Sequence, residues 1–439
     1  MIDVGLLDPA TGDAAELVGD AAYAAAMIEV EVALLGALAD VGAAPAVEID
    51  PAALAGTVDV AAVARECRGG GNPVIPLLGA LRPLLPGDVR DVLHLGATSQ
   101  DVLDSATMLV AARVRERVAA DLAEVRAGLA ALADAHRGTA VAGRTLGQQA
   151  APTVFGLRIA VLLDGIDRAG AALAALELPA QLGGSVGSVA VLADVLGQER
   201  AAQVRRRFAE RLGLTERAGV WHVERGPVAS LAAALAILLG ALGRLGLEVA
   251  QGARSELGEL DLALDAGEGG SSAMPQKRNP VAAVLLVAAG RRAPGLAATV
   301  LGAQLALDDR PAGDWHAEWQ PLRELLRLAV ESAALARGLV PALAVAADRM
   351  AANLDATDGA IHAERAQWAL VPAVGRARAA ALVRDALATG EAFVPALLRL
   401  VEGDPEAAPA VERLRAVTAS GGPVGLSDAL IDASIGGTR

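Results

Sequence analysis

The strongest fold signal is the stretch Ser105–His136, SATMLVAARVRERVAADLAEVRAGLAALADAH, in which apolar residues recur at helical spacing without a proline. At 1.5 Å per residue, a helix of about 30 residues spans roughly 45 Å. Similar runs extend from Val228 to Asp265 and from Val281 to Ala306, the last interrupted by Pro294. Helices this long bury their apolar faces best against one another, so we expect an all-α chain built on a bundle of long helices.

Shorter segments flank this bundle on both sides. Glycine, proline and aspartate break the apolar runs near the N-terminus, as in Gly69–Pro73, which predicts an N-terminal helical domain over residues 1–104. The long runs define a central bundle domain over residues 105–348. Breaks then return, and Ala419–Arg439 is rich in glycine and serine, so a small C-terminal helical domain is expected over residues 349–439.

The chain is acidic, with a formal net charge of -14 over 439 residues and a single lysine, Lys277. Phosphate binding needs clustered Lys and Arg, so nucleic acid is excluded as the main partner. An acidic protein that handles an anionic substrate must build a local positive pocket, which makes Lys277 informative. The lone Cys67 has no partner for a disulfide or a zinc site, and Met1–Ala10 lacks the basic residue of a secretory signal. We therefore expect a cytoplasmic protein.

One stretch is apolar enough to raise the question of a membrane span. Gly226–Gly243 lies between Arg225 and Arg244, but its six alanines and three glycines suit close helix packing better. We expect a buried bundle helix there, and no membrane as a partner.

The most unusual segment is Gly267–Pro280, GEGGSSAMPQKRNP, which separates two of the long helices. Its glycines allow close backbone approach, its two serines supply hydroxyls, and Lys277, Arg278 and Asn279 supply donors for an anion. A polar interhelical loop is the structural alternative, but such a loop rarely needs all these features at once. No histidine pair has the spacing of a metal site, and Gly69–Gly71 lacks the ending of a phosphate loop, so we expect no metal and no organic cofactor.

Two other segments accompany this loop, namely His94–Asp101, HLGATSQD, and Gly143–Gly156, GRTLGQQAAPTVFG. In order and spacing the three resemble the substrate loops of the fumarase, aspartase, argininosuccinate and adenylosuccinate lyase superfamily, whose signature is GSSxMPxKxNP. The resemblance covers nearly the whole chain. It implies a three-domain fold in which the long central helices form the core of a homotetramer, with each active site shared between subunits.

The resemblance also assigns roles to residues. Ser271 matches the family's base, and Lys277 with nearby backbone amides would stabilise its alkoxide, because a serine hydroxyl is too weak an acid on its own. His94, just before the first loop, is the third catalytic candidate. The substrate is expected to be a small anionic di- or tricarboxylate. Its predicted ligands are Thr98, Ser99, Arg144, Thr145, Gln148, His222, Arg225, Ser272, Met274, Asn279 and Arg310.

Further stretches narrow the resemblance within the superfamily. Trp221–His222 with Arg225, the run Trp315–Trp319 and the segment Ala352–Thr357 are similar to bacterial 3-carboxy-cis,cis-muconate cycloisomerases. That activity, in aromatic-acid breakdown, adds a carboxylate oxygen to a carbon-carbon double bond to close a lactone. An aci-carboxylate intermediate needs a base and preorganised positive donors. His316, between two tryptophans of this run, is expected to organise the bundle.

One departure from the family pattern is informative. Many relatives that eliminate an amine or water carry a histidine after the Arg-Thr of the second loop, whereas Leu146 occupies that position here. An amine or hydroxide needs a proton to leave, but a carboxylate, with a pKa of about 4, attacks or departs as the anion. Leu146 thus favours lactone chemistry, and equally permits another stable anion such as nitrite in a nitrosuccinate-type lyase.

Two further alternatives stay open. Adenylosuccinate lyase activity ranks third among the enzymatic hypotheses. A catalytically inactive oligomeric scaffold belongs to a different class, and the retention of Ser271, Lys277 and Asn279 argues against it.

Overall fold

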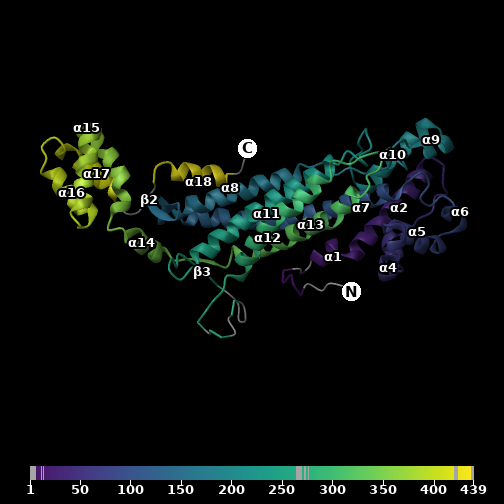
Figure 1. Ribbon diagram of the computed structural model, residues 1–439, viewed down its shortest axis with the longest axis horizontal. Coiled ribbons are helices and arrows are strands. Elements are labelled where there is room, and N and C mark those ends of the chain that lie inside the picture. Colours follow the sequence, from purple (N-terminus) through teal and green to yellow (C-terminus); the bar gives the residue numbers. More distant parts are fainter. Residues whose placement is uncertain are drawn as a thin grey trace. The chain divides into compact units, whose positions relative to one another are not determined.

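The computed structural model describes residues 6–10, 12, 14–263, 269–270, 273–274, 276–419 and 424–436. It is mostly helical, as expected (Figure 1). Its long central helices are α7 (Ser99–Ala135), α8 (Phe155–Ala174), α11 (Gly226–Gly252), α12 (Val281–Gly302) and α13 (Asp314–Leu339). The first of these, at 37 residues, contains nearly all of the stretch from which the bundle was predicted.

The chain divides into two compact units, and the boundaries between them fall inside the long helices. The first unit comprises Met1–Ala123, Arg168–Arg244 and Leu285–Arg337. The second comprises Glu124–Asp167, Leu245–Val284 and Gly338–Arg439. Because these units cut across the bundle helices, the division into three domains stays a prediction.

Short helices accompany the bundle segments in the first unit. α2 contributes a buried stripe that includes Ile28, Leu34 and Leu38, and it packs against α10. A stripe of this kind is what helical spacing of apolar residues produces. The helices of this unit outside the bundle are α1 (Ala14–Val18), α2 (Asp20–Asp40), α3 (Pro51–Ala55), α4 (Val60–Gly70), α5 (Val74–Leu81), η1 (Arg82–Leu84), α6 (Gly87–Arg90), α9 (Ala190–Leu196) and α10 (Gln198–Leu212).

Two glycines allow α11 and α12 to approach closely. A Cβ atom on Gly243 would lie 3.2 Å from the Cα of Gly290 and 3.2 Å from the carbonyl oxygen of Leu286. A larger residue at either position would have to push the neighbouring backbone away, which glycine avoids. Pro294 was expected to interrupt the apolar run, but α12 continues through it from Val281 to Gly302, so that expectation is wrong. Proline removes one helical hydrogen bond, and packing of the rest of the helix outweighs that loss.

Three helical stretches are long and apolar enough to cross a membrane, judged by length and composition alone. They are Ala14–Asp40, Gly226–Gly252 and Val281–Gly302. The first two have 61% of their apolar window buried within the chain, whereas Val281–Gly302 has 28%. α12 therefore leaves apolar side chains exposed, among them Val281 and Val284.

The second unit contains one β-hairpin, a second short antiparallel strand pair and the C-terminal helices. β1 (Ala140–Thr145) pairs with β2 (Gln148–Val154), and β3 (Leu260–Leu262) pairs with β4 (Leu343–Val345). In Figure 1, α15, α16 and α17 cluster around a separate apolar core that includes Leu370, Phe393 and Leu397. The helices here are α14 (Ala347–Asp355), η2 (Ala360–His362), α15 (Ala363–Ala388), α16 (Phe393–Glu402), η3 (Ala408–Ala410), α17 (Val411–Thr418) and α18 (Ser427–Ile435).

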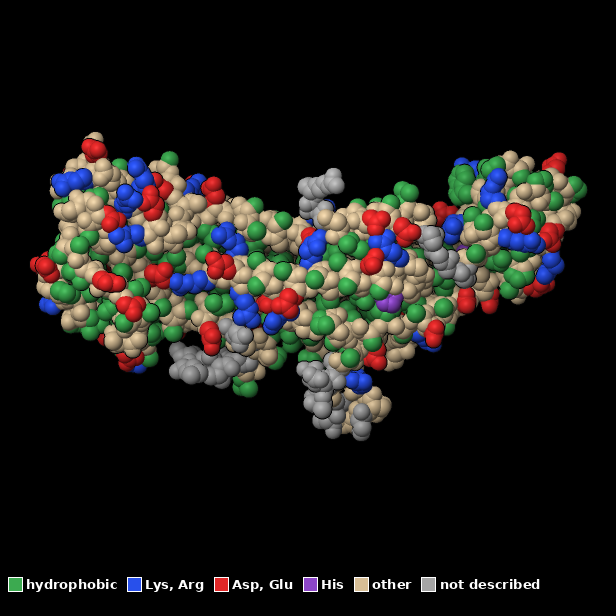
Figure 2. All heavy atoms as spheres, turned by 180° about the vertical axis from the view of Figure 1, so that it is seen from behind, with side chains coloured by type: hydrophobic (Ala, Val, Ile, Leu, Met, Phe, Trp, Pro, Cys, Tyr) green, Lys and Arg blue, Asp and Glu red, His purple; other side chains and the backbone are tan. Residues whose placement is uncertain are grey.

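The surface carries both signs of charge. On the face seen in Figure 2, arginine side chains alternate with Asp and Glu, and hydrophobic side chains lie between them. Charges of both signs are therefore interspersed on that face.

Candidate active site

The first predicted substrate loop ends at the N-terminus of α7. Ser99 is the first helical residue, so Thr98 and Ser99 stand at the helix start, where backbone amides favour anions. The Nη1 atom of Arg310 donates a hydrogen bond to the Thr98 hydroxyl. The structure thus brings together two predicted substrate ligands that lie 212 residues apart in the sequence.

Asp101 holds this loop in place. Its Oδ2 accepts hydrogen bonds from the backbone amides of Thr98 and Gly184, both at 2.9 Å. Its Oδ1 accepts the Gly183 amide at 2.8 Å and lies 2.7 Å from Nε2 of His222. A carboxylate that accepts amides in the first turn of a helix is favourable for both capping and electrostatics. Asp101 therefore fixes the loop that carries Thr98.

His222 was predicted to contact substrate, and this stays a prediction. The ring is 1% exposed and packs against Asp101, and the carbonyl oxygen of His222 accepts a hydrogen bond from the Gln100 amide at 2.9 Å. The Nε2 atom of the ring is therefore held by Asp101. His222 thus supports the first loop through its contacts with Asp101 and Gln100.

Arg225 was also predicted to bind substrate, and this stays a prediction; in the structure its guanidinium is held by two protein carboxylates. Nη1 donates to Oδ2 of Asp104 at 2.7 Å, and Nη2 donates to Oε2 of Glu318 at 2.6 Å, with all three side chains buried. Burial opposes the charge on Arg225, but Asp104 and Glu318 outweigh it and hold its pKa above the usual range. Burial also raises the pKa of Glu318. We call Asp104, Arg225 and Glu318 the buried triad.

His94 has a carboxylate partner that the sequence did not reveal. Its Nδ1 lies 2.6 Å from Oε1 of Glu31 on α2, and the two side chains are 18% and 1% exposed. A carboxylate beside Nδ1 favours the ring form with the proton there, which leaves Nε2 as an acceptor. The backbone of His94 has a φ of 66°, a left-handed conformation that is uncommon outside glycine. A catalytic role for His94 stays a prediction.

The second predicted loop forms the hairpin of β1 and β2, with Leu146 and Gly147 as its two-residue turn. Their φ angles are 51° and 82°, the positive values that tight hairpins require. Thr145 and Gln148 flank the turn and are exposed, and Leu146 is fully exposed. This tip therefore presents a hydroxyl, an amide and an apolar side chain.

Arg144 lies just below the tip and has a protein partner. It forms a two-armed ion pair with Glu259, and its side chain is 21% exposed. The Arg144 guanidinium is therefore engaged by Glu259 in the structure. Its predicted contact with substrate stays a prediction.

The third loop is described in part. Ser271 and Ser272 lie outside the described residues. Of the described ones, Lys277 and Met274 are exposed. Asn279 donates from its backbone amide and from its side-chain amide to the carbonyl oxygen of Gly269, at 2.8 and 3.0 Å. Asn279 thus closes the base of the loop, whereas its predicted contact with substrate is not tested.

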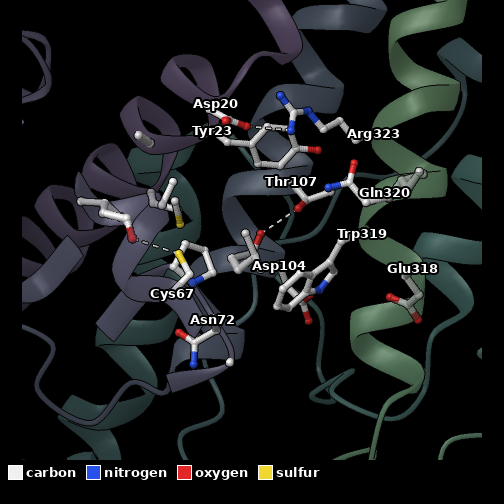
Figure 3. Close-up of a pocket in the computed structure, with 18 of the residues that line it drawn as sticks. Asp20, Tyr23, Cys67, Asn72, Asp104, Thr107, Glu318, Trp319, Gln320 and Arg323 are labelled. Carbon is white, nitrogen blue, oxygen red and sulfur yellow. Dashed lines mark hydrogen bonds and ion pairs between the residues drawn. The ribbon is translucent and has the colours of Figure 1, made fainter. Parts of the chain in front are cut away.

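A cavity of about 420 Å³ lies inside the first unit, between α2, α4, α7 and α13 (Figure 3). Asp20 and Arg323 form an ion pair of 2.7 Å at one end, beside Tyr23, whose pKa burial raises to about 12. Cys67 and Asn72 lie at the other side. Of the predicted substrate ligands, only Arg225 lines this cavity, and it is already paired. The cavity is therefore distinct from the helix start that carries Thr98.

Comparison with known proteins shows the family. The model of a lyase family matches residues 15–295. Nitrosuccinate lyase from Streptomyces davaonensis is 44% identical over 88% of this chain and 84% of the relative. The chain belongs to the fumarase/aspartase superfamily of lyases.

Other relatives of this superfamily lead to the same conclusion. The 3-carboxy-cis,cis-muconate cycloisomerase from Bradyrhizobium diazoefficiens is 38% identical over 82% of this chain and 81% of its own length. The crystal structure of the 3-carboxy-cis,cis-muconate lactonizing enzyme from Pseudomonas putida superimposes with a TM-score of 0.85 at 30% identity, and the match covers 96% of each chain. These findings confirm the predicted family, the helical fold and the conclusion that the protein is an enzyme.

Four acidic residues around the site escaped the sequence analysis as candidates. Asp101 and Asp104 lie one helical turn apart at the start of α7, a spacing that places them on one face and could have signalled a shared role. Glu31 and Glu259 sit in ordinary helical or loop sequence. Their partners come from segments distant in the chain, so no local pattern marks them.

Proposed function

We propose that this enzyme eliminates nitrite from nitrosuccinate by general base chemistry through an aci-carboxylate intermediate. The observation that carries the proposal is Leu146, a fully exposed apolar residue at the hairpin tip, where amine- and water-eliminating relatives have a proton-donating histidine. A leaving group served by this tip must depart as a stable anion. Nitrite, the conjugate base of a moderately strong acid, meets that requirement.

The reaction balances without a further reactant. Ser271 would take the proton from the carbon beside the carboxylate that is distant from the nitro group, giving a dianionic carboxylate. The electron pair then forms the carbon-carbon double bond as the carbon-nitrogen bond breaks, and nitrite leaves with its pair. Lys277 and the amides at the start of α7 would stabilise the charge, and the proton passes to solvent.

Lactone formation by 3-carboxy-cis,cis-muconate cycloisomerase chemistry is the second candidate. It satisfies the same condition, because the attacking carboxylate needs no proton donor, and relatives with that name are 38% identical to this chain. The identity of 44% to a nitrosuccinate lyase favours nitrite elimination over this alternative. Adenylosuccinate cleavage releases an amine and fits Leu146 least well.

The proposal includes assembly into a homotetramer whose active sites combine loops from different copies. The supporting observation is the exposed apolar face of the bundle helices, where Val284 of α12 is 53% exposed and Ile237 of α11 is 60% exposed. Apolar side chains left exposed on bundle helices are available for contacts with another copy of the chain. A cytoplasmic location and a small di- or tricarboxylate substrate complete the proposal.

The deciding experiment offers purified protein nitrosuccinate and 3-carboxy-cis,cis-muconate separately. Nitrite is measured by its diazo colour, and muconate by loss of ultraviolet absorbance from its conjugated diene. The proposal expects nitrite release that disappears in the Ser271→Ala variant. Loss of diene without nitrite release would replace it by the cycloisomerase, and full activity of Ser271→Ala would remove the assigned base.

A further inference from the structure

Glu259 is a buried glutamate to which neither the family resemblance nor the sequence analysis gave a role. It lies immediately before β3, on the segment that leads from α11 toward Gly269–Asn279, and its side chain is 2% exposed. A buried carboxylate is tolerated only when it is paired and hydrogen-bonded, so its partners indicate what it holds.

Those partners satisfy both carboxylate oxygens. Arg144 donates from Nη1 to Oε2 at 3.0 Å and from Nη2 to Oε1, and Asn353 donates from Nδ2 to Oε1 at 2.9 Å. Arg158 adds a cation at 3.7 Å from Oε2. Burial alone would raise the pKa of Glu259, but the hydrogen bonds and the charges of both arginines outweigh it and hold the pKa below its ordinary value. Glu259 is therefore an anion at neutral pH.

The contacts close into a ring around the hairpin. Arg144 and Gln149 face each other across the two strands, next to the bulge that follows Gly143. Gln149 donates from Nε2 to the carbonyl oxygen of Asn353 at 2.9 Å, and Asn353 in turn donates to Glu259. We call Arg144, Glu259, Asn353 and Gln149 the hairpin ring. The hairpin ring contacts both strands next to the exposed tip formed by residues 145–148. We expect these contacts to fix the orientation of the tip.

The backbone of Glu259 is also hydrogen-bonded on both sides. Its backbone amide donates to the carbonyl oxygen of Gly252 at 2.9 Å, and its carbonyl oxygen accepts the amide of Ala346 at 3.1 Å. The Asn353 side chain that binds its carboxylate also donates to the carbonyl oxygen of Leu257 at 2.9 Å. Glu259 thus anchors the segment between α11 and β3 and, through its carboxylate, the hairpin that the family resemblance assigns to substrate binding.

We propose that Glu259 is a positioning residue for catalysis, and that Arg144 serves as its partner in the hairpin ring instead of binding substrate. The effect on turnover rests on the proposed function, because it requires the tip to meet the substrate. Misplacing such groups by about 1 Å can lower a rate by about 100-fold. Loosening of the ring is therefore expected to act on kcat more than on KM.

The first test is the Glu259→Gln variant, which keeps the shape of the side chain and removes its charge. In hydrogen-deuterium exchange of the full-length protein, we expect faster exchange across residues 140–154, and a fall in kcat/KM of about 10- to 100-fold, carried by kcat. Glu256→Gln is the matched control, because Glu256 is an exposed acid three residues earlier whose side chain pairs only with Arg254 among the described contacts. It should leave both measurements unchanged.

The Asn353→Ala variant covers the case in which Glu259→Gln fails to fold. It breaks the hairpin ring without leaving a charge unpaired, and it should also speed exchange across residues 140–154. Wild-type exchange there in either folded variant overturns the proposal. The exchange measurement needs no substrate. If nitrite release is not found, the proposed function is refuted, but the exchange rates still test whether Glu259 positions the hairpin.

The second test separates the two roles of Arg144. Replacing both members of a buried pair by apolar groups of similar size costs little compared with removing one. If Arg144 only positions the hairpin, Arg144→Met combined with Glu259→Leu should regain at least about 10-fold in kcat/KM over Arg144→Met alone. A double variant as inactive as Arg144→Met would show that Arg144 contacts substrate, and would overturn that part of the proposal.

Discussion

Replacing Arg225 by methionine should destabilise the fold strongly and in a pH-dependent way. The guanidinium donates six hydrogen bonds, five of them to the carboxylates of Asp104 and Glu318 and one to the carbonyl oxygen of Trp221. Methionine fills a similar volume but supplies neither charge nor donor. The variant leaves two carboxylates facing each other in the interior, with side-chain exposures of 5% and 3%.

The expected loss of stability follows from the protonation of these two carboxylates in the variant. Two buried carboxyl groups without a cation share a proton, as carboxylate pairs do elsewhere. Holding one carboxyl group of ordinary pKa near 4 protonated at pH 7 costs about 4 kcal/mol, which agrees with the roughly 3–5 kcal/mol lost when one partner of a buried ion pair is removed. At about pH 5 the same proton costs only about 1.4 kcal/mol.

The sign of the pH dependence follows from proton linkage. In the variant the folded pKa of the pair lies above its unfolded value, so the folded state binds more protons than the unfolded state. Stability relative to wild type should therefore fall as the pH rises from about 5 to 7. Burial already raises the pKa of Glu318 in the wild-type protein, and loss of Arg225 moves it further in the same direction.

Urea unfolding followed by tryptophan emission measures this loss, because the Trp315 indole donates to Oδ1 of Asp104 at 3.0 Å and reports on the buried triad. Arg113→Met is the matched control, since Arg113 pairs with Glu29 at side-chain exposures of 39% and 34%. Such a pair contributes about 0–1 kcal/mol. The reasoning is refuted if Arg225→Met costs no more than Arg113→Met, or if its deficit is the same at about pH 5 and pH 7.

Three further outcomes are expected. Burial raises the pKa of Glu331 to about 7 despite its partner Arg327, so this group withdraws stability as pH rises from 4.5 to about 7. In Glu331→Gln, the thermal midpoint should vary less over that interval; an unchanged slope contradicts the assignment. Gly243→Leu should force α11 and α12 apart and lower stability by about 1–3 kcal/mol in urea unfolding, and wild-type stability would argue against the close approach. Glu31→Gln should lower kcat by about 10-fold or more by releasing the His94 ring, with unchanged kcat as the contrary result.

Much of the fold was predictable because it rests on local periodicity. The apolar spacing of Ser105–His136 predicts a long helix, and the structure has α7 over Ser99–Ala135. The hairpin of β1 and β2 was predicted as a loop, because Gly143–Gly156 resembles a substrate loop of the superfamily; its alanines and glycines are residues that strands disfavour. Its strands are held by tertiary contacts such as the pair of Arg144 and Glu259, which a single sequence does not reveal.

Site residues were predictable only where they belong to a sequence motif of the family. Thr98 and Ser99 stand at a helix start as the resemblance implied, and Arg310 joins them through the hydroxyl of Thr98. The buried partners of Arg225 and His222 were not predictable, because an arginine or histidine near a substrate motif looks the same whether it binds a ligand or a buried aspartate. The partners of a buried side chain lie far away in the sequence. Glu318, which binds Arg225, is more than 90 positions from it.

The most direct test of the proposed chemistry compares three succinates that differ only in the leaving group. Purified enzyme is given nitrosuccinate, malate and aspartate, and formation of the unsaturated dicarboxylate is followed by its ultraviolet absorbance. Because Leu146 supplies no proton to the leaving group, we expect rapid elimination of nitrite and no detectable elimination of water or ammonia. Turnover of malate or aspartate within about tenfold of nitrosuccinate would contradict the account, because hydroxide and amine cannot leave unassisted at such a rate.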